Sequence, residues 1–333
     1  MWHRWMLLLL LSLPLHVHGS QPLARLLVAT SDGPYISYSW GEYWETLRHR
    51  LPLDIRLFDC LGPRAYAGGP QGLFVSNDYG ELWTEVESWN GGGVTALLTS
   101  SYFAAEPVIF VGTSHGLHRS PDGGEEKWER IAEAVMRGRV YVMVWPGPSL
   151  FVGTSQGLFH SADGGDDWER LDGGLPDAAV LSLAVSSYFG IEPVVFVGLQ
   201  GGGIYRSRDG GESFEPVSDE DWSGQSVRAI YWWKSVLFAG TDRGLFVSND
   251  AGETWESASA ELAGEAILAI SIPTAESPTG SDILVGTERG VFKSSDGATT
   301  WRQASAGMNA AGAVHGFGAF PILSQDFDSG RRD

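Results

Sequence analysis

The chain has 333 residues and a formal net charge of −19 at pH 7, with 22 basic and 41 acidic residues. This charge repels phosphate backbones, so we expect neither nucleic acid nor anionic lipid as the main partner. The single cysteine, Cys60, excludes an internal disulfide, while 44 glycines and 14 tryptophans suit many short strands joined by tight turns.

The first predicted element is a secretory signal peptide at residues 1–19. Arg4 supplies a short basic start, and an almost unbroken apolar run follows from Met6 to Leu15. The run is shorter than the roughly 20 apolar residues of a spanning helix, and a plausible cleavage site precedes Ser20. We therefore expect a secreted or periplasmic protein with no membrane span after cleavage. An uncleaved N-terminal anchor stays open as the alternative.

A repeated pattern then fills the chain from about residue 25 to 323. It consists of an apolar triplet followed by G-T-x-x-G-[LV]-[FHY]-x-S-x-D-x-G-x-x-W, most complete between Leu237 and Trp255. Successive copies lie about 39 to 46 residues apart, the length of a propeller blade. In the first copy Ser39 replaces the Asp. The copies that keep it contain Asp78, Asp122, Asp163, Asp209, Asp250 and Asp296.

Each repeat predicts four short strands. In the sixth repeat these are Val227–Trp232, Val236–Gly240, Gly244–Ser248 and Thr254–Ser257. The Ser-x-Asp-x-Gly segment is the turn between the third and fourth strands. Its Asp accepts hydrogen bonds from backbone N–H groups of the turn, its Gly takes a positive φ, and the following Trp packs against the blade. We therefore interpret these Asp residues as structural.

The chain ends predict how the ring closes. The first repeat has its second strand at Leu26–Ala29 but no room for an inner strand before it, and a spare strand-like segment lies at Ala313–Ile322. We expect that segment to be the inner strand of the first blade, which removes two open sheet edges. The predicted fold is all-β: a seven-bladed propeller of four-stranded antiparallel blades over residues 20–323, with a flexible polar tail at 324–333.

Alternate repeats share a second pattern. The third and fifth repeats both contain Ser-Ser-Tyr-Phe followed by Glu-Pro-Val, at residues 100–108 and 186–194, and the seventh is also extended between its first and second strands. This indicates duplication of a two-blade unit. The Tyr-Phe loops are a second candidate surface, unless they only pack against the adjacent turn.

The box from Ser248 to Trp255 resembles the Asp-box or BNR repeat, and the resemblance covers nearly the whole mature chain. It implies a β-propeller but no single function, because such repeats occur in sialidases, xyloglucan-degrading glucanases, the sortilin luminal domain and photosystem II assembly-factor propellers. The G-T-x-x-G-L-F step is most similar to the photosystem II assembly-factor propellers and the bacterial proteins that resemble them. As a whole, the chain most resembles the assembly-factor-like and sortilin-like propellers. Sialidase-type enzymes are more distant.

The hypothesis that the protein is an enzyme has little support in the sequence. Sialidase-like enzymes have six blades and an Arg-Ile-Pro motif, whereas this chain has seven repeats and no such motif. Arg56, Arg139 and Arg228 lie on or near inner strands, but the sequence leaves open whether they converge. A glycoside hydrolase also needs two carboxylates about 5–10 Å apart in one cleft. We expect a non-catalytic binding or assembly scaffold, with a glycan-binding or glycoside-hydrolysing (sialidase-like) propeller as the alternative.

No cofactor and no metal site are expected. His115 and His118 are three residues apart on a strand and point to opposite faces. His118 stands where other repeats have Phe74 and Phe159, so it is expected to pack. The boxes lack the run of oxygen ligands of a calcium loop.

The candidate binding face carries the turns between second and third strands, which surround a central depression. Asp242-Arg243 and Glu288-Arg289 place an acid beside a base in adjacent blades. These pairs either neutralise one another or present two arginines to a partner. We expect a monomer that binds a protein or glycan ligand here, unless the turns are simply solvated. The candidate partner-binding residues are Asp32, His115, Gln156, Gln200, Asp242, Arg243, Glu288 and Arg289, with Gln71 at the same turn position.

Overall fold

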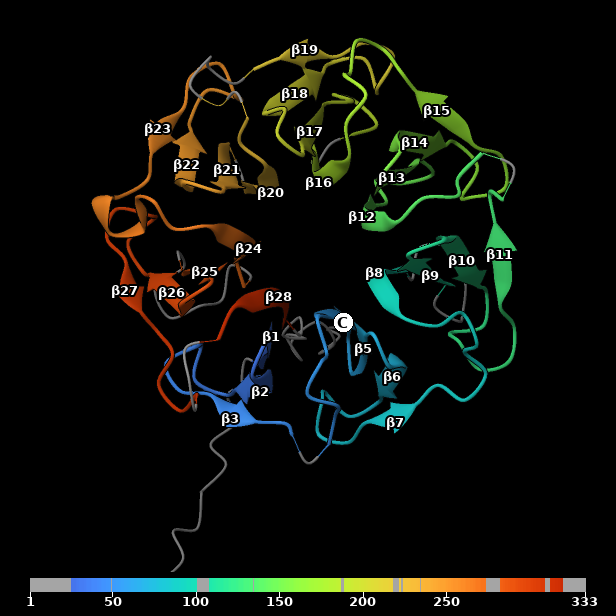
Figure 1. The fold of residues 1–333 in the computed structure, drawn as a ribbon, viewed down its shortest axis with the longest axis vertical. Coiled ribbons are helices and arrows are strands. Elements are labelled where there is room, and N and C mark those ends of the chain that lie inside the picture. The colour runs from blue at the N-terminus through green and yellow to red at the C-terminus, as the bar shows by residue number, and fades with distance from the viewer. Residues whose placement is uncertain are drawn as a thin grey trace, which may run out of the picture.

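In a computed structural model the chain forms a closed ring of seven four-stranded antiparallel sheets (Figure 1). The structure describes residues 25–319 except 49, 101–107, 134, 187–188, 218–221, 223, 234, 274–281 and 309–311. The predicted seven-bladed β-propeller is confirmed. The proposed signal peptide, the polar tail and most of the Tyr-Phe loops lie outside the described residues. Within the described part, no helix is long and apolar enough to cross a membrane.

The strands alternate regularly from the centre of the ring to its rim. The inner strands of blades 1 to 7 are β28 (Val314–Ala319), β4 (Leu57–Leu61), β8 (Val94–Ser100), β12 (Val140–Val144), β16 (Val180–Val185), β20 (Val227–Trp233) and β24 (Ile267–Ser271). The second strands are β1 (Leu26–Thr30), β5 (Arg64–Gly69), β9 (Val108–Thr113), β13 (Leu150–Thr154), β17 (Val195–Leu199), β21 (Val236–Thr241) and β25 (Ile283–Thr287).

The third strands are β2 (Gly33–Ser37), β6 (Gly72–Ser76), β10 (Gly116–Ser120), β14 (Gly157–Ser161), β18 (Ile204–Ser207), β22 (Gly244–Ser248) and β26 (Gly290–Ser294). The outer strands are β3 (Glu45–Thr46), β7 (Thr84–Glu85), β11 (Glu129–Ile131), β15 (Glu169–Leu171), β19 (Glu215–Pro216), β23 (Glu256–Ser257) and β27 (Arg302–Gln303). A short 3₁₀ helix, η2 (Ala260–Leu262), follows β23. The outer strand of blade 6 is shorter than the predicted Thr254–Ser257, and the outer strands are mostly exposed.

Ring closure follows the prediction. β28 pairs antiparallel with β1, from Leu26 opposite Ala319 to Thr30 opposite Val314, so that the last strand is the inner strand of the first blade (Figure 1). The predicted segment continues to Ile322, but residues 320–322 are outside the described part. Segments from both ends of the described chain thus contribute to one sheet, and β28 covers the inner edge that β1 would otherwise leave unpaired.

The recurring Gly-Thr step has a packing cause. A Cβ on Gly112 would lie 2.7 Å from the Val140 side chain of the next blade, so only glycine allows the blades to approach this closely. The Thr113 hydroxyl that follows donates to the carbonyl of Gly116 at 3.0 Å and accepts from the N–H of His115 at 3.1 Å, which closes the turn between second and third strands.

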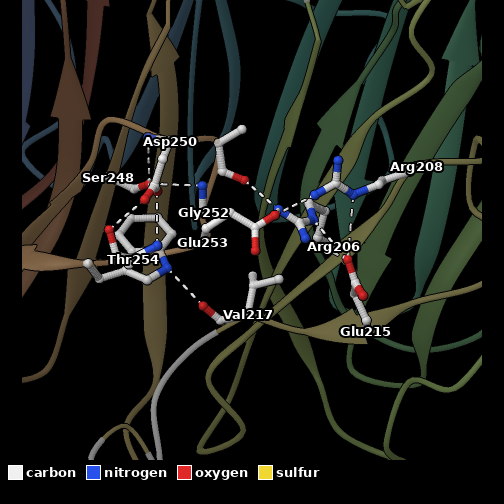
Figure 2. Close-up of polar contacts among 11 residues, drawn as sticks. Arg206, Arg208, Glu215, Val217, Ser248, Asp250, Gly252, Glu253 and Thr254 are labelled. Carbon is white, nitrogen blue, oxygen red and sulfur yellow. Dashed lines mark hydrogen bonds and ion pairs between the residues drawn. The ribbon is translucent and has the colours of Figure 1, made fainter.

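The Ser-x-Asp turns are held by their own side chains, as blade 6 shows (Figure 2). Ser248 accepts from the Gly252 N–H and donates to the Asp250 carboxylate, both at 2.8 Å. Asp250 also accepts from the backbone N–H of Thr254 at 2.9 Å. Hydrogen bonds from Thr254, and then from Ser248, lower the pKa of Asp250 to about 2. In blade 1 Ser39 takes the place of the Asp.

Candidate binding site at the mouth of the central channel

The inner strands of the seven blades surround the centre of the ring (Figure 1). In six blades the register skips one inner-strand residue. In β12, for example, Val140 pairs with Thr154 and Val142 pairs with Gly153. Such a bulge leaves the skipped residue unpaired and changes the direction of its side chain from the one that regular alternation along the strand would give. The skipped residues are Thr95, Tyr141, Leu181, Arg228, Leu268 and His315. In blade 2 the corresponding place belongs to Arg56, whose N–H donates to the Gly68 carbonyl at 2.9 Å.

A cavity of about 340 Å³ opens at this level, lined by residues of four consecutive blades, 1 to 4. Its polar lining consists of Arg56, Thr95, Arg139, Tyr141 and His315. Apolar side chains from β4, β8 and β12 complete it, and no Asp or Glu occurs among the described lining residues. The inner strands begin opposite the ends of the second strands, so the cavity lies at the end of the channel that carries the turns between second and third strands.

Two arginines dominate the electrostatics of this cavity. The side chains of Arg56 and Arg139 are exposed, and neither joins an ion pair with a described residue. The guanidinium carbon of Arg139 lies 5.4 Å from the ring centroid of Tyr141, a cation–π contact that orients it. Partial burial, and then the charge of Arg56, lower the pKa of His315. The lowered pKa favours the neutral form of His315 at pH 7, so the positive charge of the cavity comes mainly from the two arginines.

The turn of blade 4 positions Arg139. The backbone N–H of Arg139 donates to the Ser155 hydroxyl at 3.1 Å, and the N–H of Arg137 donates to the Gln156 side-chain oxygen at 3.1 Å. Gln156 was among the residues expected to bind a partner directly. In the structure it holds the loop that carries Arg139 into the cavity.

The other predicted residues form a rim around the mouth and do not line the cavity. Arg228 pairs with Asp242 at 2.7 Å, and of the three inner-strand arginines Arg56 and Arg139 line the cavity. Asp32 pairs with Arg48 at 2.5 Å. Arg289 pairs with Glu265 at 2.7 Å, and the His115 ring is hydrogen-bonded to the Ser114 hydroxyl at 2.8 Å. The side chains of the other predicted residues are exposed: Gln200, Arg243 and Glu288. The neighbouring acid and base in each pair therefore do not neutralise each other.

His118 has a packing role, as expected from its strand position. Its ring lies edge-on to Trp89 with the centroids 5.1 Å apart, and burial lowers its pKa. Among the described residues, no group of three or more His, Cys, Asp or Glu side chains is arranged to hold a metal ion.

The comparisons concern structure, because no family model matches the sequence and a search of curated proteins finds no relative. The chain is similar to the extracellular domain of BT4673 from B. thetaiotaomicron, with a TM-score of 0.62, 17% identity, and coverage of 75% of this chain and 33% of that one. It is similar to a GH74 xyloglucanase from Xanthomonas campestris, with a TM-score of 0.66, 16% identity, and coverage of 90% and 52%.

A third similar structure is YCF48 bound to D1 peptide, with a TM-score of 0.56, 16% identity, and coverage of 75% of this chain and 82% of that one. The chain thus spans about a third of the first neighbour and about half of the second. At these identities the likeness shows the fold alone, and that fold is the seven-bladed β-propeller.

Proposed function

We propose that the protein is an exported, non-catalytic binding or assembly scaffold whose channel mouth binds a carboxylate-bearing segment of a protein partner. One observation carries the proposal: Arg56 and Arg139 share a cavity of about 340 Å³ that has no acidic residue among its described lining. In a chain with a net charge of −19 this is a local reversal of sign. A site of this kind selects and steers an anionic group.

The chemistry of the cavity fits recognition. The planar guanidinium forks of Arg56 and Arg139 bind a carboxylate through paired hydrogen bonds, and the partly enclosed wall strengthens those bonds. Glycoside hydrolysis needs two carboxylates across one cleft, and the described lining offers none. The exposed side chains of Gln200, Arg243 and Glu288 would then contact the rest of the partner around the rim.

Comparisons and turn geometry support the broader assignment. YCF48, which shares the fold, is described as bound to a peptide, and the BT4673 neighbour is an extracellular domain. The hydrogen bonds of Ser248 and Asp250 are those we expected of an Asp-box, so we assign the repeats to the Asp-box or BNR type. The apolar run at residues 6–15 supports export through a signal peptide.

One observation favours a second candidate, binding of an acidic glycan. Tyr141 lies beside Arg139 in the same cavity, and two arginines with a tyrosine also suit the carboxylate of a sugar acid. The Glu that a sialidase-type Tyr–Glu pair would need is not among the described lining residues. The second candidate function is therefore binding of an acidic glycan without its hydrolysis.

A peptide titration separates these readings. We expect a fluorescent Glu-rich heptapeptide to bind, and the same peptide with Gln in place of Glu to bind at least tenfold more weakly. The double variant Arg56→Ala with Arg139→Ala should also weaken binding at least tenfold, about 1.4 kcal/mol. The matched control, Lys127→Ala with Arg208→Ala, removes two exposed cations from the opposite face. Equal binding by both double variants contradicts the proposal. Displacement of the peptide by sialic acid favours the glycan.

A further inference from the structure

An ionic contact between neighbouring blades recurs at three places on the face that carries the Ser-x-Asp turns. In each, the basic residue directly before the turn Ser reaches an acid three positions after the Asp site of the next blade. The three contacts are Arg119 to Asp166 at 2.7 Å, Arg206 to Glu253 at 2.9 Å, and Lys293 to Glu42 at 2.9 Å. They join blades 3 and 4, 5 and 6, and 7 and 1, as a duplicated two-blade unit would.

Between blades 5 and 6 this contact contains two cations and two acids (Figure 2). Arg206 is only 4% exposed and pairs with Glu215 at 2.6 Å as well as with Glu253. A second arginine, Arg208, is more exposed than Arg206 and pairs with Glu253 at 2.5 Å and with Glu215 at 3.6 Å. The two positive and two negative charges balance.

The contact between blades 7 and 1 is balanced in the same way. Lys293 pairs with Glu42 and also with Asp282 at 3.1 Å. Arg302 is the second cation and pairs with Glu42 at 2.5 Å. Two cations again meet two acids.

Between blades 3 and 4 one cation is missing among the described residues. Arg119 pairs with Glu129 at 2.6 Å and with Asp166 at 2.7 Å, which correspond to Glu215 and Glu253. The place of Arg208, the residue between the turn Ser and Asp, is taken by Pro121. Arg119 is accordingly 22% exposed, against 4% for Arg206.

A cavity of about 400 Å³ lies at this point. Its lining consists of Val108, Arg119, Pro121, Glu129, Trp145, Asp163 and Gly164. Asp166 is not among them but pairs with the lining residue Arg119. Trp145 packs edge-on against Phe110 with the ring centroids 5.1 Å apart, and Trp232 packs against Phe196 in the same way between blades 5 and 6. The two places therefore share their scaffold and differ at the missing arginine.

We propose that this cavity binds the guanidinium group of an arginine side chain from a protein partner. Between blades 5 and 6, Arg208 shows how a second guanidinium binds the two equivalent acids, Glu215 and Glu253. In the open copy Glu129 is 50% exposed and Asp166 is 66% exposed, so both can accept further hydrogen bonds. Val108 and Pro121 offer an apolar wall for the stem, and the Trp145 ring suits a cation. The site lies on the face opposite the channel mouth and is independent of it.

The test is a calorimetric or NMR titration with the peptide acetyl-Gly-Arg-Gly-amide. We expect one site, and at least tenfold weaker binding when citrulline, which is isosteric but neutral, replaces arginine. Glu129→Gln should weaken binding, and Pro121→Arg should abolish it by supplying the missing guanidinium from the chain itself. Arg208→Ala should open the equivalent place between blades 5 and 6 and raise the stoichiometry to two.

Three results overturn the proposal: no binding to the folded wild-type protein, equal binding of the citrulline peptide, or unchanged binding by Pro121→Arg. A stoichiometry that stays at one in Arg208→Ala contradicts the equivalence of the two places. Circular dichroism confirms that each variant is folded. None of these variants should alter binding of the Glu-rich peptide at Arg56 and Arg139, so this proposal and the proposed function fail separately.

Discussion

The buried ion pair that joins blades 7 and 1 should make Lys293→Met strongly destabilising. Lys293 is 3% exposed, lies 3.1 Å from Asp282, which is 2% exposed, and donates to the Trp40 carbonyl at 2.8 Å. Methionine keeps the apolar stem but leaves Asp282 buried beside an uncharged group. Removing one partner of a buried pair costs about 3–5 kcal/mol. Ser295 still donates to Asp282 at 2.6 Å, so we expect the lower end of that range, about 3 kcal/mol.

Urea unfolding at pH 7, followed by tryptophan fluorescence, measures this loss. Combining Lys293→Met with Asp282→Asn should recover more than half of it, because no uncompensated charge remains. The matched control is Arg170→Ala, which breaks an exposed pair with Asp177 and should cost less than about 1 kcal/mol. A loss below about 1 kcal/mol in Lys293→Met, or no recovery in the double variant, would refute the reasoning.

Three further predictions concern stability. Truncation after Gly312 removes β28 and should sharply lower the melting temperature or leave the chain insoluble, as a thermal scan would show. Asp250→Ala should lower the melting temperature on the order of 2–4 °C, because it frees the turn N–H groups, while binding of the Glu-rich peptide stays unchanged; lost binding at unchanged stability would make the turns functional. Burial raises the pKa of Asp59 to about 6, despite the hydrogen bond from the Thr99 N–H, so its stabilising protonated form is lost as pH rises through 6. Asp59→Asn should therefore be the more stable protein at pH 8, by at most about 3 kcal/mol, with the difference vanishing near pH 4 in urea titrations.

The sequence predicted the fold closely because the repeat marks local chemistry at fixed offsets. Val236 and Gly244, set by the apolar triplet and by the turn glycine, are the first residues of β21 and β22, as predicted. The outer strand was predicted from Thr254 but begins at Glu256, because the Thr254 N–H binds Asp250 and is unavailable for pairing in the sheet. Closure was also predicted, since a missing strand at one end matched a spare strand at the other.

The candidate site was predicted less well, and the reason is geometric. In a regular strand, side chains alternate between the two faces of the sheet, so Tyr141 would pair with a residue of β13 and point to the face opposite Val140 and Val142. The bulge breaks that register and brings Tyr141, with Thr95 and His315, to the channel. A bulge leaves no clear mark in one sequence. The sequence therefore showed Arg56 only as a residue near a strand start, and its place in the same cavity as Arg139 depends on how blades 2 to 4 pack around the channel.

The most direct test of the central claim is to map where the Glu-rich peptide touches the protein. A photo-crosslinking residue at position 315 stands in the channel mouth, and one at position 82 replaces Leu82, which is 69% exposed in a Ser-x-Asp turn on the opposite face. We predict cross-links to the peptide from position 315, their loss in the Arg56→Ala with Arg139→Ala background, and none from position 82. Cross-links from position 82 alone, or from position 315 with both arginines removed, would contradict an anion-binding site at the channel mouth.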